Sequence, residues 1–293
     1  MSMPFESLIA QLHESGSLKV WSLIITFFGD SIVNRGGNVS ASTVHTVLDR
    51  IDIGSGATRT AFSRLANDGW VKRQKLGRRS YYQLTEQGMR LFSEAAQRIY
   101  SPVDSAKNQP DSWLLGMNLD KSALNQLPIA NAIVLPNRSM LIVNPDERAV
   151  KCVSELGFLS VTGQLNDVPQ WIVDHLRPAD WKEQIQALQN SFSHVATELP
   201  SDRLSSLATR TLLVHQWRRL LLRYPPIPSA LKGESLQLEN ECREFVGDLY
   251  HSLSNAAENW LVEKGSCIEG ALPVAKVNAI DRFTNHYSRQ SNL

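Results

Sequence analysis

The chain has 293 residues, of which 42% are hydrophobic and 20% charged, and a formal net charge of +1. This balance excludes a largely disordered or fibrous protein, and the length suits about two or three domains. The longest apolar-rich run, residues 21–28, is too short to span a bilayer, and no basic and apolar secretion signal opens the chain. We therefore expect a cytoplasmic protein without a membrane partner.

The basic excess lies at the N-terminus, where residues 1–100 hold 12 Lys and Arg against 8 Asp and Glu. Apolar residues within 20–28 recur at the spacing of one helical face, and Gly29-Asp30 should stop or bend this first helix. After a glycine-containing loop, Ser40 or Ser42 can cap a second helix. Its expected apolar face consists of Val44, Val47, Leu48 and Ile51.

A third helix and a two-stranded ribbon are expected next. The helix should cover residues 57–67, with an outer face that is polar, cationic and free of acids. Its inward stripe would consist of Ala57, Ala61, Phe62 and Leu65. Residues 70–76 and 80–84 favour two strands around a Gly77-Arg78-Arg79 tip, and Thr85 can cap a further helix. Helix, turn, helix and ribbon in this order predict a winged helix-turn-helix.

Seven Lys and Arg residues against one acid lie within residues 54–82, which gives this segment a local net charge of +6. Such an excess favours contact with phosphates, because neutralising them releases condensed counterions. A helix fits the major groove, where Arg can pair with guanine and Ser or Thr can meet base edges, while the ribbon tip should hold the backbone or reach the minor groove. The expected contacts to double-stranded DNA are Thr58, Arg59, Thr60, Ser63 and Arg64 on the helix and Lys72, Lys75, Arg78, Arg79 and Tyr81 on the ribbon.

A second interpretation of this segment is a protein-interaction module. Winged helices also dock proteins, and cationic surface runs are often only solvated. The DNA interpretation is favoured because the helices and the cationic ribbon occur together in the expected order.

The middle of the chain has a mixed pattern. Residues 101–112 contain prolines among polar residues and should link the first domain, residues 1–100, to the second. Strands are expected at 113–119, 132–135, 140–143 and 158–162, and helices at 146–156 and 179–198. This alternation predicts an α+β domain over residues 113–200.

From residue 201 onward the pattern becomes helical. Ser201 can cap a helix that Pro225-Pro226 halts, and a second helix is expected at about 236–261. We therefore expect a C-terminal helical domain over residues 201–293, with a loose tail from Phe283.

The first hundred residues also contain a series of motifs that are specific when taken together. They are Phe28-Gly29-Asp30, Arg35-Gly36-Gly37, Thr58-Arg59-Thr60-Ala61-Phe62-Ser63-Arg64-Leu65, Gly69-Trp70 and Gly77-Arg78-Arg79-Ser80-Tyr81-Tyr82-Gln83-Leu84-Thr85. These motifs resemble the PaaX family of repressors, and Leu213-Val214-His215-Gln216-Trp217-Arg218-Arg219 resembles the C-terminal helical motif of that family.

The resemblance implies a multidomain α+β fold with a winged-helix domain, a ferredoxin-like central module and a helical C-terminal domain. It also implies a homodimeric regulator of aromatic catabolism, phenylacetate in the type member. Such a regulator is released from its DNA operator by an aryl-CoA thioester such as phenylacetyl-CoA. A regulator of a different, non-phenylacetate pathway is the alternative.

Four residues of the C-terminal motif could bind such an effector. His215 and Arg219 lie one turn apart on the expected helix, beside Trp217 and Arg218. An anionic thioester needs cations for its phosphates and an apolar wall for its acyl group. The alternative is that Trp217 packs in the core, that His215 is a hydrogen-bonded interior residue and that the arginines pair with acids of the next helix.

The chain carries no recognisable catalytic motif. Nucleophile, phosphate-loop and dinucleotide-binding patterns are missing, and Cys152, Cys242 and Cys267 have no second Cys or His at metal-ligand spacing. We therefore expect no enzyme activity, no metal and no resident cofactor, and free thiols in a reducing compartment. An enzyme with an accessory DNA-binding domain is the third hypothesis.

Overall fold

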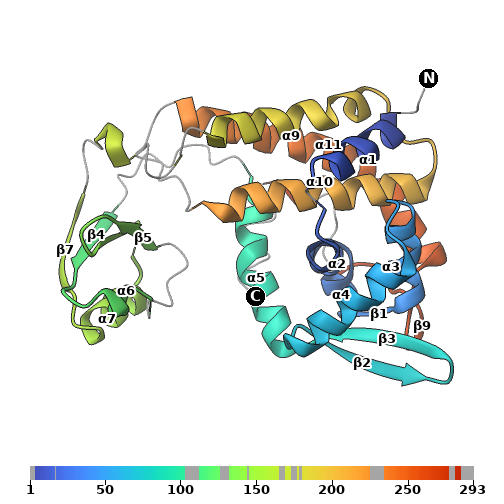
Figure 1. Cartoon of the computed structure of the whole chain (residues 1–293), viewed down its shortest axis with the longest axis horizontal. Coiled ribbons are helices and arrows are strands. Elements are labelled where there is room, and N and C mark those ends of the chain that lie inside the picture. Colours follow the sequence, from blue (N-terminus) through green and yellow to red (C-terminus); the bar gives the residue numbers. More distant parts are fainter. Residues whose placement is uncertain are drawn as a thin grey trace. The chain divides into compact units, whose positions relative to one another are not determined.

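The computed structural model describes residues 4–16, 18–102, 112–125, 132–143, 145–164, 169–172, 177, 180–224, 234–276 and 281–284. In these ranges helices alternate with small sheets, so the chain is a mixed α+β protein, as the sequence predicts (Figure 1). No helix of the described part is long and apolar enough to cross a membrane. Most of the expected linker at 101–112 lies outside the described residues.

The chain forms two compact units. Unit 1 consists of Met1–Val103, Gln186–Leu220 and Glu241–Leu293, and unit 2 of Asp104–Ile185 and Leu221–Asn240. This grouping differs from the three predicted regions, because most of the C-terminal helices pack with the N-terminal segment. Packing between segments so far apart leaves no pattern in the local sequence from which this grouping could be predicted. As independently folding domains, the three regions remain a prediction.

Unit 1 begins with α1 (Pro4–Glu14), a helix that the sequence analysis did not predict. The predicted first helix follows as α2 (Val20–Phe27). Gly29-Asp30 was expected to stop or bend this helix, but the backbone continues as a π-turn, η1 (Phe28–Ile32), and a 3-10 turn, η2 (Val33–Arg35). π-Turns of this kind often occur at functional positions.

Glycine at position 29 allows close packing of the π-turn. A Cβ atom on Gly29 would lie 2.7 Å from the ring of Phe92, which belongs to helix α5 (Glu86–Tyr100). Thr85 caps α5 as expected, since its hydroxyl accepts a hydrogen bond from the Gly88 amide at 3.0 Å.

The helices expected at 40–51 and 57–67 are confirmed as α3 (Ala41–Asp49) and α4 (Ser55–Asn67). Of the two expected caps, Ser40 is the one used, because its hydroxyl accepts a hydrogen bond from the Thr43 amide at 3.1 Å. A short strand before α3, β1 (Asn38–Ser40), was not expected.

The ribbon expected after α4 is confirmed as β2 (Val71–Leu76) and β3 (Arg79–Leu84). Gly77 at the tip has φ +58, a left-handed conformation that favours glycine. Strand β3 lies in the middle of a three-stranded antiparallel sheet, between β1 and β2. The ribbon therefore has a third strand at its base.

Unit 2 contains a four-stranded antiparallel sheet with the order β5-β6-β4-β7. Its strands are β4 (Ser112–Met117), β5 (Ala132–Leu135), β6 (Ser139–Val143) and β7 (Leu159–Gln164), and its helices are α6 (Lys121–Asn125) and α7 (Glu147–Glu155). Leu114, Met140 and Ile142 on one face of the sheet share a core with residues of both helices. The strands expected near 113, 132, 140 and 158 are thus confirmed, within a few residues at their ends.

The long helices α9 (Asp180–Thr197), α10 (Arg203–Arg223) and α11 (Glu234–Lys264) agree with the expected ones. The cap of α10 is Asp202 rather than Ser201, because its carboxylate accepts hydrogen bonds from the amide and hydroxyl of Ser205. Its buried Thr209 and Thr211 are accommodated because their hydroxyls donate to the carbonyls of residues 205 and 207.

The C-terminal third was expected to be wholly helical, but it is not. A small hairpin, β8 (Ser266–Cys267) with β9 (Gly270–Ala271), follows α11. Residue 283 was expected to begin a loose tail, but Phe283 packs against the rings of Tyr100 and Tyr250. Residues 285–293, the rest of the expected tail, lie outside the described residues.

Candidate nucleic-acid interface

Helix α4 has one buried and one exposed face. The buried stripe is Thr58, Ala61, Phe62 and Leu65, at the spacing i, i+3, i+4 and i+7. Ala57, predicted to be buried, is exposed, and Thr58, predicted to contact DNA, is only 3% exposed. The Thr58 hydroxyl donates to the Gly54 carbonyl at 3.2 Å, so this polar residue can occupy the inward position. Thr58 is therefore left out of the candidate interface.

A groove of about 480 Å³ runs between α4, the start of α3 and the sheet that carries the ribbon. Arg59 and Ser63 of α4 line it, together with Ser42 and His45 of α3 and Arg73 of β2. Of the five α4 residues predicted to contact DNA, Arg59 and Ser63 thus lie exposed on the same concave surface as the ribbon, and the buried Thr58 also borders it. This surface combines Arg, Ser and His side chains that can meet base edges or phosphates.

The remaining two predicted DNA contacts on α4, Thr60 and Arg64, are exposed but do not line this groove. The Arg64 guanidinium lies 4.8 Å from the ring centroid of Trp21, and its Nε is 3.6 Å from the Asp68 carboxylate. Arg64 therefore already has an aromatic and an acidic neighbour within the protein.

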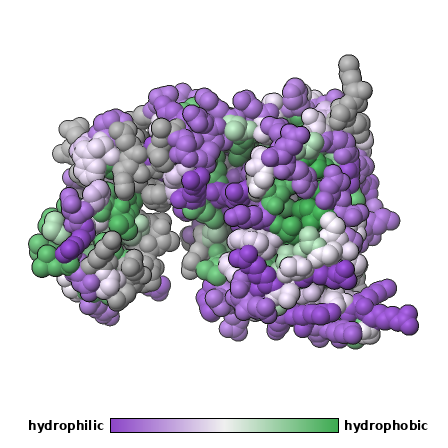
Figure 2. All heavy atoms as spheres, viewed as in Figure 1, coloured by the Kyte–Doolittle hydropathy of each residue, from purple (hydrophilic) through white to green (hydrophobic). Residues whose placement is uncertain are grey.

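The ribbon carries exposed cations along its length. Lys72, Lys75, Arg78 and Arg79 are exposed, and none has a carboxylate within 4.0 Å in the described part of the chain. Figure 2 shows the ribbon as a strongly hydrophilic projection. Tyr81, also predicted to contact DNA, is only 4% exposed, because β3 is the central strand of the sheet. Tyr81 is therefore left out as well.

Aromatic rings connect the ribbon to α4 and to the π-turn η1. The ring of Tyr82 stacks on Phe62 with centroids 3.7 Å apart and planes at 8°, and Phe62 meets Phe28 edge-on at 6.4 Å. Burial raises the pKa of the Tyr82 hydroxyl, while the nearby Arg73 lowers it in part. The stack fixes the ribbon against α4, so the two walls of the groove share one support.

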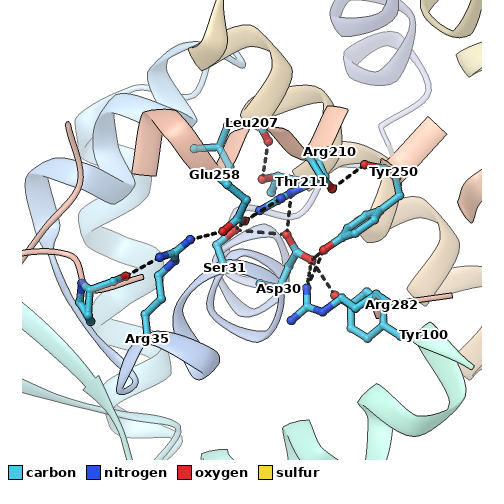
Figure 3. Close-up of polar contacts among 12 residues, drawn as sticks. Asp30, Ser31, Arg35, Tyr100, Leu207, Arg210, Thr211, Tyr250, Glu258 and Arg282 are labelled. Carbon is cyan, nitrogen blue, oxygen red and sulfur yellow. Dashed lines mark hydrogen bonds and ion pairs between the residues drawn. The ribbon is translucent and has the colours of Figure 1, made fainter. Parts of the chain in front are cut away.

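The π-turn that begins at Phe28 carries a buried acid, Asp30, surrounded by cations and hydroxyls (Figure 3). Its carboxylate accepts hydrogen bonds from the hydroxyls of Tyr100 at 2.9 Å and Tyr250 at 3.0 Å. Arg210 of α10 lies 3.1 Å away, and Arg282 donates both to the carboxylate and, at 2.8 Å, to the Asp30 carbonyl. We call these five residues the Asp30 cluster.

The Asp30 cluster is charged at neutral pH. Burial would raise the pKa of the Asp30 carboxyl, but Arg210, Arg282 and the two tyrosine hydroxyls outweigh that effect and lower the pKa below its usual range. Burial raises the pKa of both Tyr100 and Tyr250, so their hydroxyls stay protonated and donate. The cluster therefore consists of one anion, two cations and two neutral donors.

A second acid extends the cluster. Glu258 of α11 accepts a hydrogen bond from Arg210 at 2.8 Å and pairs with Arg35, which follows the π-turn. No ion pair was predicted from the sequence for any of these residues, and Asp30 was expected only to stop or bend a helix. The available signal was an aspartate within an otherwise apolar helical run, although its partners lie up to 252 positions away.

The four residues predicted to bind an effector do not form one exposed patch. His215 and Trp217 are fully buried, with His215 Nδ1 3.2 Å from the Thr26 hydroxyl and Trp217 Nε1 donating to the Ile99 carbonyl at 3.0 Å. Arg218 donates to the Ser22 hydroxyl at 3.0 Å, and burial lowers its pKa. Only Arg219 is exposed.

The described part of the chain offers neither a metal site nor a disulfide. No group of His, Cys, Asp and Glu there could hold a metal ion. Cys152, Cys242 and Cys267 are free thiols, of which the last two are buried.

Comparison with known proteins gives matches over most of the chain. Residues 19–88 match the family model described as PaaX-like protein, and residues 171–263 match the model described as PaaX-like protein C-terminal domain. The transcriptional repressor PaaX of Escherichia coli (strain K12) is 25% identical over 286 residues, which cover 89% of each chain. The solved structure of the uncharacterized protein Rv0674 from Mycobacterium tuberculosis has 15% identity and a TM-score of 0.44, and covers 74% of this chain and 89% of that one.

Proposed function

The chain belongs to the PaaX family, and we propose that it is a transcriptional repressor that binds a double-stranded DNA operator through the groove between α4 and the ribbon. The observation that carries this proposal is that Arg59 on the wall of the groove and four exposed ribbon cations have no carboxylate within 4.0 Å among the described residues. The ribbon cations are Lys72, Lys75, Arg78 and Arg79. Cations without carboxylate partners can exchange counterions for phosphates without first breaking an ion pair.

Two finer assignments of the fold belong to this proposal. We propose that residues 1–100 form a winged helix-turn-helix domain, supported by α3, α4 and the ribbon in that order. We propose that the sheet of unit 2 is ferredoxin-like, supported by its βαββαβ sequence of elements and the order β7-β4-β6-β5.

In the proposed complex the exposed residues divide into two roles. Arg59 and Ser63, which share the groove, contact base edges, while Lys72, Lys75, Arg78 and Arg79 hold phosphates. Two copies of the chain place their α4 helices in successive major grooves, about 34 Å apart. Thr60 and Arg64 lie beside this surface and contribute less.

The proposed operator controls genes for aromatic-acid catabolism, and the proposed inducer is an aryl-CoA thioester such as phenylacetyl-CoA. Both rest on the family resemblance. The inducer releases DNA only if it binds the released conformation more tightly than the DNA-bound one. Since His215 and Trp217 are buried, a thioester would reach them only after α10 moves, whereas Arg219 is accessible to its phosphates.

We propose no catalytic activity, because the relative in Escherichia coli is named a repressor and the chain carries no recognisable nucleophile, phosphate-loop or dinucleotide-binding motif. Incubation with a panel of aryl-CoA thioesters tests this point. Release of free thiol would favour an enzyme instead.

Fluorescence anisotropy with labelled DNA from upstream of the chain's own gene, compared with scrambled DNA, tests the proposed function. We expect Arg59→Ala to weaken binding to the upstream DNA more than to the scrambled DNA. Arg148→Ala is the matched control, since Arg148 is an exposed arginine of α7 in unit 2. Equal binding by wild type and Arg59→Ala on both DNAs would contradict the assignment of this groove, and absence of any DNA binding would favour a protein-interaction module.

A further inference from the structure

The groove between α4 and the ribbon contains polar side chains that have no role in the contacts proposed so far. His45 of α3 and Arg73 of β2 both line it, together with the hydroxyls of Ser42 and Ser80. None of its lining residues is an Asp or a Glu. The groove therefore offers hydrogen-bond donors and positive charge on the walls opposite α4 as well as on α4 itself.

Arg73 lies on the face of the ribbon that is turned towards α4. It is opposite Tyr82 in the register of β2 and β3, and residues directly opposite each other share a face. Tyr82 stacks on Phe62 of α4, so this face is the one that borders the groove. Lys72, one residue earlier, lies on the other face of the ribbon. Arg73 is thus the ribbon cation that lines the groove.

The Arg73 guanidinium is held in place without being neutralised. Its Nη2 donates to the Ser80 hydroxyl at 2.8 Å, and its Nε lies 3.3 Å from the same oxygen. In the described part of the chain no carboxylate lies within 4.0 Å of it. A hydroxyl fixes the direction of the guanidinium but cancels none of its charge, so its remaining donors stay available to an anion.

His45 contributes a nitrogen that the protein does not use. Its Nδ1 is buried and has no hydrogen-bond partner among the described residues. Buried polar atoms nearly always have a partner, so an exception requires an explanation. A ligand seated in the groove that His45 lines would provide one, because an imidazole with its proton on Nδ1 donates to an anion.

The shape of a DNA duplex indicates which anion this is. An α-helix fits the major groove of DNA, and a narrow arm or ribbon tip can enter the minor groove. The two grooves of a duplex are separated everywhere by one sugar-phosphate strand. A protein with α4 in the major groove and the ribbon in the adjacent minor groove must therefore straddle that strand. In this chain the space between these two elements is the groove of about 480 Å³.

We propose that one sugar-phosphate strand of the operator lies in this groove, where Arg73 and His45 hold its phosphates. Arg59, on the α4 wall, then reaches the bases beside that strand. The inference rests on the proposed DNA binding and adds two residues that position the strand between α4 and the ribbon. Neither residue is at the ribbon tip or on the outer face of α4.

Anisotropy titrations with upstream and scrambled DNA at several salt concentrations test the role of Arg73. We expect Arg73→Ala to weaken binding to both DNAs alike, by at least about tenfold, because a charged contact to a phosphate carries no sequence information. The slope of log Kobs against log salt should fall by about 1. Arg73→Lys keeps the charge, so it should keep the slope and lose only part of the affinity. Arg148→Ala is the matched control and should bind like the wild type.

The same titrations test His45. His45→Ala should weaken binding to both DNAs alike, by a smaller factor than Arg73→Ala, because it removes a hydrogen bond to a phosphate. His194→Ala, at an exposed histidine of α9, is the matched control and should bind like the wild type. Thermal unfolding of each variant checks that it is folded.

Ethylation of single phosphates in the upstream DNA gives a readout that a folding defect cannot imitate. Neutralising a phosphate that the groove holds should weaken binding of the wild type. A variant that lacks the matching side chain should no longer respond to ethylation at that phosphate, because the contact is already lost. We expect Arg73→Ala and His45→Ala to lose their response at the same phosphate or at neighbouring phosphates of one strand.

Three results would overturn the inference. They are an Arg73→Ala or His45→Ala variant that binds as well as its control, a loss of affinity restricted to the upstream DNA, and affected phosphates that lie on different strands. Each would leave the proposed function in place, because Arg59→Ala and Arg79→Ala test it independently. A wild type that binds neither DNA would instead overturn the proposed function and this inference together.

Discussion

Two groups of arginines in unit 1 have opposite surroundings. Arg59, Arg78 and Arg79 on α4 and the ribbon are exposed and have no carboxylate within 4.0 Å among the described residues. Arg210 and Arg282 are buried and bind Asp30. The difference separates two uses of the same side chain, because an exposed guanidinium remains available to phosphates whereas a buried one must be neutralised within the protein.

The comparison also indicates how the DNA-binding helices are held. Asp30 lies two residues after Phe28, which contacts Phe62 of α4, and Phe62 stacks on Tyr82 of the ribbon. The buried arginines come from α10 and the C-terminal segment, so the Asp30 cluster attaches the C-terminal part of unit 1 to the helix that supports the groove. Loss of the exposed arginines should therefore affect DNA alone, and loss of the cluster should affect folding.

The largest effect is expected for Asp30→Ala. It removes the shared acid and leaves two buried guanidinium groups without their main partner, which typically costs about 3–5 kcal/mol of unfolding free energy. Urea unfolding measures this cost. Asp68→Ala, which removes the exposed partner of Arg64, is the control and should cost at most about 1 kcal/mol. Similar costs for both variants would contradict the buried-pair account.

A related effect should appear in acid. The pKa of Asp30 is lower in the folded protein than its ordinary value of 3.8, so the stability it contributes is present above that value and is lost as the pH falls through the folded pKa. Unfolding free energies measured between neutral pH and about pH 2 should fall more for the wild type than for Asp30→Asn. If the unfolding free energies of the two proteins fell equally with pH, Asp30 would not be charged in the folded protein.

The next effect concerns recognition of the operator. Arg59→Ala should cost roughly 1–3 kcal/mol of binding free energy on the upstream DNA and less on scrambled DNA. Arg64→Ala should cost less than Arg59→Ala, because the Arg64 guanidinium lies over Trp21 outside the groove. Anisotropy titrations at one salt concentration compare the two. An Arg64→Ala variant that loses more affinity than Arg59→Ala would place the base-contacting face elsewhere on α4.

The smallest effect is expected at the tip of the ribbon. Arg79→Ala should weaken binding to upstream and scrambled DNA alike, and should reduce the slope of log Kobs against log salt by about 1. Thermal unfolding should be unchanged, because Arg79 is exposed. A loss restricted to the upstream DNA would show that Arg79 contacts bases rather than phosphates.

Local patterns were enough to predict α3, α4, the ribbon and most strands of unit 2, because helical and strand periodicities extend over only a few residues. The same patterns placed Ala57 rather than Thr58 on the inward face of α4. Thr58 can lie in the buried stripe because its hydroxyl donates to the Gly54 carbonyl. Tyr81 was expected at the surface because a sequence does not show that β1 covers the ribbon strand on its other side.

The Asp30 cluster could not be predicted, because its members come from five separate segments of the chain. The same reason explains the effector residues: whether His215 faces a ligand or Thr26 depends on how α10 packs against α2, 189 positions away. Long-range packing determined the part of the site that short patterns missed.

The salt dependence of wild-type binding to the upstream DNA tests the central claim most directly. Four ribbon cations and Arg59 are available for phosphates, and each phosphate contact contributes about −0.9 to the slope of log Kobs against log salt. We predict a slope of roughly −3 to −5 for each bound copy, with a smaller value for Arg79→Ala. A slope near zero, or no binding at low salt, would contradict a DNA-binding role for this surface.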